Sequence, residues 1–267
     1  MPPIGNCPTF SYHGSKAKEA KWLVSHFTKA NKRYHRYIST FAGRANDFFR
    51  LVTTNPIADK YILNDKYNAD WLIALRDYNG DWNFVDDYVD KNIFLKWRNS
   101  PDSIERTLAA SYVCYHGNRY NISSANNYQL DSIYGSPNFK KNLIRKFRLA
   151  QDILRKFSVE ISSMDYRDFL CEISPASNDI LYFDPPYYGN YDQRKTYPTI
   201  NHEEFCDIVI DIKGHKFISN YNNDIYSNKL SGWIVHSKER VSTAKQRQGT
   251  DGKNIVKTEI LWEDLKI

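Results

Sequence analysis

Four consecutive residues, Asp184-Pro185-Pro186-Tyr187, combine groups that can hold and activate an amine. The two prolines fix the backbone φ angle and remove two N–H donors, so the carbonyl groups of the segment are free to accept hydrogen bonds. A carboxylate and a free carbonyl can each accept one N–H of an amine, which favours the pyramidal nitrogen that attacks an electrophilic methyl group. Tyr187 adds a flat ring for stacking. The segment therefore predicts a site for an aromatic amine.

The exocyclic amine of adenine is such a group, and it is a poor nucleophile because its lone pair is delocalised into the ring. A base reaches a protein site of this kind only after it leaves the duplex, and stacking with edge hydrogen bonds partly offsets that cost. The structural alternative is a Pro-Pro turn after a core strand, with Asp184 capping a helix.

The elements around this motif alternate between strand and helix. The apolar run from Asp179 to Phe183 predicts a buried strand that stops at Asp184. Apolar spacing predicts helices at 22–27, 48–52 and 71–78, and strands at 37–41, 60–64, 216–219, 233–235 and 256–262. This order predicts an α/β fold with a doubly wound, Rossmann-like sheet. Such sheets bind ligands beyond the carboxyl ends of their strands, so we expect Gly43, Asp65 and Asp184 at one crevice.

The middle of the chain has a different pattern. Residues 81–157 read mainly as helices around an irregular polar stretch, 117–137, that is rich in Asn, Ser and Tyr. We therefore expect a catalytic domain made of residues 1–80 and 158–267, with 81–157 as an inserted, mainly helical lobe that recognises the target.

Other segments follow one another in an order that matches a known family. They are Tyr12-His13-Gly14-Ser15-Lys16, Phe41-Ala42-Gly43, Asn64-Asp65, Asp165-Tyr166, Asp184-Pro185-Pro186-Tyr187, Phe217-Ile218-Ser219-Asn220 and Thr258-Glu259-Ile260-Leu261. Along nearly the whole chain the sequence resembles the Dam-like family of DNA adenine methyltransferases. The resemblance implies a Rossmann-like methyltransferase that transfers a methyl group from S-adenosylmethionine to the exocyclic amine of a flipped adenine in double-stranded DNA. It implies the catalytic residues Asp184, Pro185, Pro186 and Tyr187.

The same resemblance implies the residues that hold the cofactor. They are Tyr12, Lys16, Phe41, Ala42, Gly43, Asp65, Asp165, Tyr166 and Asp184. Lys16 is expected near the cofactor carboxylate and Asp65 at the ribose hydroxyls, while Asp165 and Tyr166 hold its adenine. Without the resemblance, Lys16 reads as a solvated charge and Asp65 as a helix cap.

The sequence departs from the family pattern in two places. Ala45 stands where the cofactor loop of the family has a second glycine, a position that tolerates a positive φ angle. This departure suggests the alternative of a non-catalytic DNA-binding protein on the same fold. Asn118-Arg119-Tyr120-Asn121 is only loosely similar to the Asn/Arg-rich hairpin with which family members read DNA. A cytosine amine or an RNA substrate is a further alternative, although aspartate at position 184 favours adenine.

Charge gives a weaker indication of the same partner. The net charge is +6 and the isoelectric point about 8.9, which favours a polyanion. The polar stretch from Ser237 to Lys253 predicts a loop, which is either a solvated connection or a clamp on the DNA backbone. The proposed contacts of this clamp are Lys238, Arg240, Lys245 and Arg247.

Several classes of function lack their signatures. No run approaches the roughly 18 to 20 apolar residues of a membrane span, and no signal peptide is apparent. The cysteines lie far apart and the histidines show no ligand-like spacing, so we expect no metal. Neither a phosphate-binding loop nor a Gly-x-Ser-x-Gly motif is present. We expect a cytoplasmic protein of a bacterial or phage-type host. The recognition sequence and the oligomeric state do not follow from the sequence.

Overall fold

A computed structural model describes residues 7–10, 15–83, 139–188, 200–241 and 256–264 of the chain. Between positions 84 and 138 it also describes 85, 88–89, 92, 96–97, 99–100, 105 and 134–135. The chain packs as two compact units, residues 1–169 and 170–267, and each unit is described by itself.

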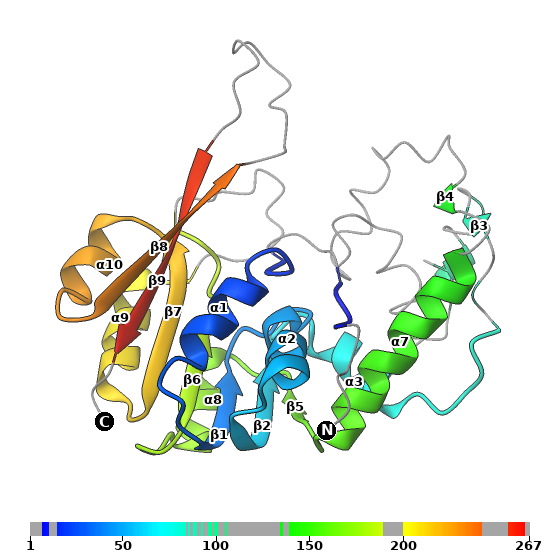
Figure 1. The fold of residues 1–267 in the computed structure, drawn as a ribbon, viewed down its shortest axis with the longest axis horizontal. Helices are drawn as coiled ribbons and strands as arrows, with labels where there is room; N and C mark the ends of the chain where they lie inside the picture. Colours follow the sequence, from blue (N-terminus) through cyan, green and yellow to red (C-terminus); the bar gives the residue numbers. More distant parts are fainter. Residues whose placement is uncertain are drawn as a thin grey trace, which may run out of the picture. The chain divides into compact units, whose positions relative to one another are not determined.

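Unit 1 is built around three parallel strands in the order β5-β2-β1. Its elements, labelled in Figure 1, are α1 (Ala20–Phe27), β1 (Tyr34–Ser39), α2 (Asn46–Thr54), β2 (Ala58–Asn64), α3 (Ala69–Asp77), β3 (Tyr88–Val89), β4 (Tyr134–Gly135), α7 (Phe139–Lys156) and β5 (Glu160–Ser162), followed by the start of α8 (Tyr166–Ile173). Helix α1 packs on α2, and α3 packs on α7. The register pairs Ser39 with Leu63 and Leu63 with Ile161, so the three strands end level with one another.

Aromatic rings fill the core of unit 1. Phe10 lies against Trp71 with ring centroids 4.6 Å apart, and it also contacts Phe147 of α7. Tyr61 of β2 packs on Phe48 of α2 at 5.5 Å. The carboxyl-terminal halves of β1 and β2 are buried, whereas their first residues include exposed positions. Burial thus increases toward the strand ends that carry Thr40 and Asp65.

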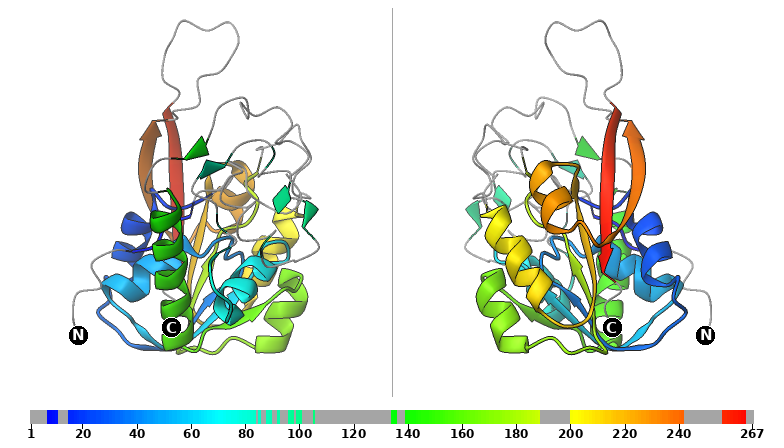
Figure 2. Two further views of the ribbon diagram at one scale, coloured as in Figure 1. Left: turned by 90° about the vertical axis from the view of Figure 1, so that its right-hand side faces the viewer. Right: turned by 90° about the vertical axis from the view of Figure 1, so that its left-hand side faces the viewer.

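Unit 2 combines parallel and antiparallel strands in the order β6-β7-β9-β8. Its elements are β6 (Ile180–Phe183), α9 (His202–Asp211), β7 (His215–Tyr221), α10 (Asp224–Lys229), β8 (Ile234–Val241) and β9 (Val256–Asp264). Strands β6 and β7 run parallel and are almost fully buried. β9 is antiparallel to both β7 and β8, and Figure 2 shows β8 and β9 side by side as an extended ribbon.

The expected α/β fold with alternating strands and helices is confirmed. Strand β8 is longer than expected: it continues to Val241, so Ser237–Val241 are strand residues and not loop, because each of them pairs in register with β9. The apolar pattern did not reveal β5, whose three residues are partly exposed. Most of 84–138 lies outside the described residues, so the division into a catalytic domain and an inserted lobe stays a prediction.

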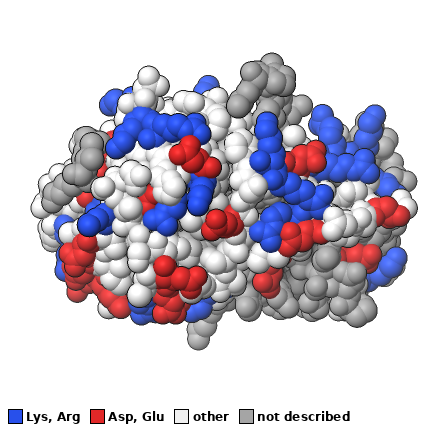
Figure 3. Space-filling model, turned by 90° about the horizontal axis from the view of Figure 1, so that it is seen from below, with Lys and Arg blue, Asp and Glu red and all other residues white. Residues whose placement is uncertain are grey.

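The surface charge of the described residues is mixed. On the face drawn in Figure 3, Lys and Arg side chains alternate with Asp and Glu side chains, and the described residues form no single continuous basic area there. Within the described part of the chain, no helix has the combination of length and apolar character that crossing a membrane requires.

A buried histidine makes the stability of unit 2 depend on pH. His202 begins α9, is 8% exposed and shares a 2.8 Å hydrogen bond with the hydroxyl of Tyr226. Burial lowers the pKa of His202 from 6.5 to about 4. The unfolded chain therefore binds a proton at a higher pH than the folded chain does, and stability falls as the pH drops through this window.

We expect the free energy of unfolding to decrease by about 2 kcal/mol between pH 7 and pH 5 because of this residue. Urea denaturation at the two pH values checks this for the wild type and for His202→Gln, which cannot titrate. Between pH 7 and pH 5, the free energy of unfolding of the variant should decrease less than that of the wild type, and the difference should equal the contribution of His202. Identical pH dependence in both proteins would assign the effect to other groups.

Candidate active site

The loop after β1 is held by the residues that follow β2. The backbone N–H of Ala42 donates to the carbonyl of Asn64 at 2.9 Å, and that of Gly43 donates to Oδ2 of Asp65 at 2.7 Å. Gly43 itself adopts a φ angle of 54°. The structure thus brings Ala42, Gly43 and Asp65 together, as the sequence predicted for residues beyond the carboxyl ends of parallel strands.

Ala45 keeps the backbone conformation that a glycine would adopt. Its φ of 54° and ψ of 34° lie in the left-handed region, directly before α2. An alanine there costs about 1 kcal/mol of strain, and the buried methyl group offsets part of that cost. The alanine therefore keeps the backbone conformation that the family's glycine would adopt, and this backbone gives no support to the non-catalytic alternative.

Asp65 has two roles at once. Its Oδ1 accepts from the backbone N–H groups of Tyr67 and Asn68 and from the Asn68 side chain, at 2.7 to 3.1 Å. The residue thereby caps the turn that leads into α3, which is the alternative role that the sequence left open. Its Oδ2 accepts only from Gly43 among the hydrogen bonds described. A carboxylate oxygen has two lone pairs, so Oδ2 can accept one further donor.

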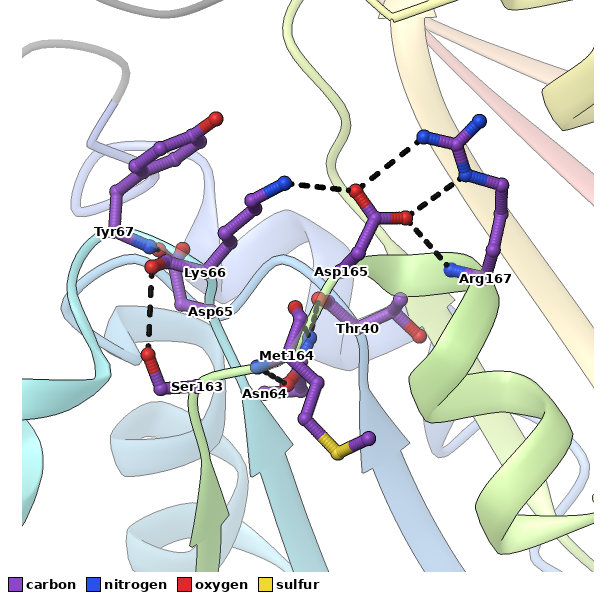
Figure 4. A network of polar contacts seen from close by, with 9 residues as sticks. All are labelled: Thr40, Asn64, Asp65, Lys66, Tyr67, Ser163, Met164, Asp165 and Arg167. Carbon is purple, nitrogen blue, oxygen red and sulfur yellow. Dashed lines mark hydrogen bonds and ion pairs between the residues drawn. The ribbon is translucent and has the colours of Figure 1, made fainter.

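Asn64 connects the ends of three strands, a role that the sequence did not assign to it. Its Nδ2 donates to the carbonyls of Thr40 and Met164, each at 3.1 Å, and its Oδ1 accepts from Ser162 and from the backbone of Met164. Figure 4 shows this side chain between the loops that follow β1 and β5. Asn64 is 1% exposed and uses both ends of its amide.

Asp165 lies in the loop after β5, next to two cations. The Arg167 guanidinium approaches Oδ1 to 2.9 Å and the Lys66 amine approaches Oδ2 to 3.0 Å (Figure 4). Arg167, and then Lys66, hold the pKa of Asp165 far below its ordinary value. The neighbouring Tyr166 ring lies 5.6 Å from the ring of Phe41. Two residues from distant parts of the sequence thus form an aromatic pair beside a carboxylate.

Lys16 is buried, with only 7% of its surface exposed, and is not the solvated charge that its position alone suggests. It lies near Asp47, in the first turn of α2. Burial raises the pKa of Asp47, while the Tyr37 hydroxyl at 2.5 Å, the N–H groups of the helix start and the charge of Lys16 act in the opposite direction. Asp47 gave no signal in the sequence beyond an acidic residue in a helix start.

The segment before Lys16 is tied to the same helix. The side chain of Asn46 accepts from the backbone N–H of Phe10 at 2.8 Å and donates to the Phe10 carbonyl and to Ser15, both at 2.9 Å. This amide anchors both ends of the segment that contains Tyr12. Tyr12 itself lies outside the described residues.

In unit 2, the carboxylate of Asp184 is oriented by a chain of hydroxyl groups. The Ser219 hydroxyl donates to Oδ1 of Asp184 at 2.9 Å. Because Ser219 has one hydroxyl hydrogen, the Tyr182 hydroxyl is the donor in its 2.9 Å contact with Ser219. Asp184 directly follows β6.

Tyr187 is fixed through its hydroxyl as well as its ring. The hydroxyl donates to Oε1 of Glu259, a residue of β9 that is 1% exposed. The ring meets that of Tyr221 edge to face, with centroids 4.7 Å apart. Burial, then the nearby charges of Asp184 and Glu259, raise the pKa of Tyr187 well above its ordinary value. Between Asp184 and Tyr187, Pro185 is buried and Pro186 partly buried.

The predicted nucleic-acid contacts are only partly described. Lys238 lies on β8 opposite Glu259, and Arg240 lies opposite Lys257. The others are outside the described residues: Asn118, Arg119, Tyr120, Asn121, Lys245 and Arg247.

Comparison with solved structures finds distant similarity. An rRNA methyltransferase, aviRa from Streptomyces viridochromogenes, is 10% identical, with 98% of this chain and 87% of that chain covered and a TM-score of 0.40. A SAM-dependent O-methyltransferase from Thermotoga maritima is 12% identical, with 92% of this chain and 64% of that chain covered and a TM-score of 0.34. Among curated proteins, no significant match was found.

A family model gives a more specific result. The model of the D12 class N6 adenine-specific DNA methyltransferases matches residues 12–248, which include Lys16, Asp65 and the Asp184–Tyr187 motif. The methyl donor of such enzymes is S-adenosylmethionine and their substrate is DNA. Because the match extends over most of the sequence, the chain belongs to the family of D12 class N6 adenine-specific DNA methyltransferases.

Proposed function

We propose that this chain is a site-specific enzyme that methylates the exocyclic amine of an adenine flipped out of double-stranded DNA. The observation that carries the proposal is the environment of Asp184. A carboxylate at the end of a buried strand is held in one orientation by Ser219 and Tyr182, and two prolines follow it. The family assignment favours adenine in DNA over a cytosine amine or RNA.

The residues of the motif act on the amine by accepting hydrogen bonds from its N–H groups. Asp184 and the carbonyl of Pro185 each accept one N–H, which concentrates the lone pair on the nitrogen. The protein itself orients the Asp184 carboxylate, because Ser219 donates to it. Tyr187 stacks on the base, and its contact with Glu259 keeps the ring in place.

The residues of unit 1 fit S-adenosylmethionine. Lys16 supplies a buried cation for the cofactor carboxylate, Oδ2 of Asp65 can accept from a ribose hydroxyl, and Phe41 with Tyr166 offers flat surfaces for adenine. Tyr12, Ala42, Gly43, Asp165 and Asp184 complete the proposed set. When bound, the cofactor supplies a methyl group on a positively charged sulfur. Any contact between Asp165 and the cofactor must be shared with Lys66 and Arg167.

The proposed DNA contacts are of two kinds. Asn118 to Asn121, within the proposed target lobe 81–157, would read bases. Lys238, Arg240, Lys245 and Arg247 would contact phosphates, which position a protein on DNA without specifying sequence. Lys238 lies across the strand pair from Glu259, so one side chain of this group is close to the residue that holds Tyr187.

We expect Asp184→Ala to abolish methyl transfer and to leave cofactor binding nearly unchanged, because its main role is at the amine. Ser219→Ala removes a hydrogen bond to a charged group and should lower kcat roughly ten- to hundredfold, with little change in the KM for the cofactor. Incorporation of labelled methyl groups into DNA and calorimetry provide the two measurements. Asp207→Ala, on the exposed side of α9, is the matched control. Near-normal turnover by the Asp184 variant would reject the assignment.

Asp65→Asn preserves the shape of the side chain but removes one acceptor oxygen. Cofactor affinity should fall roughly ten- to hundredfold, because a ribose hydroxyl and the Gly43 N–H lose a charged acceptor. Titration calorimetry measures the dissociation constant. Asp70→Asn, an exposed position in the first turn of α3, tests for a general effect of the same substitution. An unchanged dissociation constant would leave Asp65 with its capping role alone.

Tyr187→Ala should lose most activity because the flipped base has no ring to stack on, whereas Tyr187→Phe should keep much of it. The phenylalanine variant removes the hydroxyl that donates to the buried Glu259 carboxylate, so it should lower the free energy of unfolding by roughly 1 to 3 kcal/mol. Glu259→Gln retains an acceptor for the tyrosine and serves as the control. Kinetics and urea denaturation separate the two effects. Equal losses of kcat in the alanine and phenylalanine variants would mean that the hydroxyl acts in catalysis.

A further inference from the structure

Asn220 of β7 lies beside the catalytic motif and is 0% exposed. The parallel register pairs Phe183 with Ile218. Continued along the chain, this register places Asp184 beside Ser219, which agrees with their hydrogen bond, and Pro185 beside Asn220. The side chain also contacts the end of the motif loop, because its Oδ1 accepts from the backbone N–H of Tyr188 at 3.3 Å.

The orientation of this amide is set by its oxygen. Oδ1 accepts from two backbone N–H groups, those of Tyr188 and of Tyr221 at 2.8 Å. Rotating the amide by half a turn would point its N–H groups at two donors, so the assignment of oxygen and nitrogen is determined by chemistry. Nδ2 is then the other end, and it is buried with no hydrogen-bond partner among the residues that the structure describes.

A buried donor without an acceptor is costly. Leaving such a group unsatisfied destabilises the folded protein, and native proteins keep few of them. A ligand that brings an acceptor to this position recovers that free energy. The same side chain contacts the motif loop at Tyr188, so the ligand in question is the one that the motif holds.

We propose that Nδ2 of Asn220 donates a hydrogen bond to a ring nitrogen of the target base. This rests on the proposed function. Asp184 and the Pro185 carbonyl only accept, so they recognise any aromatic amine; a donor beside them adds recognition of the ring. Two ring nitrogens of adenine flank the exocyclic amine, N1 and N7, and both accept hydrogen bonds. When a single asparagine recognises adenine, its amide oxygen accepts from the exocyclic amine and its amide nitrogen donates to a ring nitrogen. Here Asp184 accepts from the amine, and Asn220 only donates to the base.

The test uses duplexes that contain the sequence methylated by the wild-type chain. The target carries adenine, 1-deazaadenine or 7-deazaadenine, and each analogue lacks one of the two ring nitrogens. The proteins are the wild type, Asn220→Asp and Asn201→Asp. The first variant keeps the acceptor for Tyr188 and Tyr221, loses the donor and adds a buried negative charge. The comparison between analogues separates loss of the donor from this charge, because a charge effect lowers kcat/KM equally on every target base. The control makes the same change at the exposed N-cap of α9, where aspartate is also a good cap.

We expect Asn220→Asp to lower kcat/KM on adenine DNA roughly ten- to hundredfold, with unchanged cofactor affinity. On the analogue that lacks the contacted nitrogen, the kcat/KM of the wild type should fall to a similar extent. The kcat/KM of the variant should be no lower on this analogue than on adenine. The other analogue should lower the kcat/KM of both proteins by the same factor. The difference between the two analogues identifies N1 or N7 as the partner.

Three results would overturn the inference. They are an unchanged kcat/KM in Asn220→Asp, additive losses with both analogues, or a wild type that does not distinguish either analogue from adenine. The last result needs no variant, so misfolding of Asn220→Asp does not prevent the test. Failure of the wild type to methylate adenine in any DNA is a different result, and it would reject the proposed function together with this contact.

Discussion

One buried carboxylate organises the ligand-facing end of unit 1. Asp65 accepts from the loop after β1 through one oxygen and from the turn before α3 through the other. Parallel strands make this possible because their carboxyl ends meet at one edge, where loops from distant sequence positions can share a side chain. Asn64 extends the same arrangement to the loop after β5. The residues proposed to contact the cofactor are thus positioned by hydrogen bonds within the protein itself.

Unit 2 follows a similar principle with different chemistry. The motif after β6 presents acceptors, and its own backbone cannot donate at the two prolines. Orientation therefore comes from neighbouring strands: Ser219 of β7 holds Asp184, and Glu259 of β9 holds Tyr187. Each of these partners is almost fully buried, which strengthens the hydrogen bond that it makes. In such a site, Asn220 is distinctive because it contributes a donor among acceptors.

At Ala45, a residue other than glycine adopts a left-handed backbone conformation. The family pattern has a glycine at this position, which tolerates a positive φ angle, and the structure has that angle with an alanine. The cost of roughly 1 kcal/mol is small beside the hydrogen bonds that fix Ala42 and Gly43 on either side of the turn. Local propensity is therefore overruled by the contacts of the loop. The same holds for Ser237 to Val241, whose polar sequence indicated a loop and whose pairing with β9 makes a strand.

The sequence by itself determined the strands and helices with strong apolar periodicity, the order of the motifs and the family. These depend on residue types at short spacing, which local patterns record. It also marked Asp65, Asp184 and Tyr187, because their residue types carry the chemistry. Only the tertiary structure decided which side chains hold them: Asn64, Asp47, Ser219 and Glu259 contact partners far away in the sequence, so no spacing rule reveals them. The sequence placed Asn220 in a segment that resembles the family but gave it no role, because an unpaired N–H is costly only once folding has buried it.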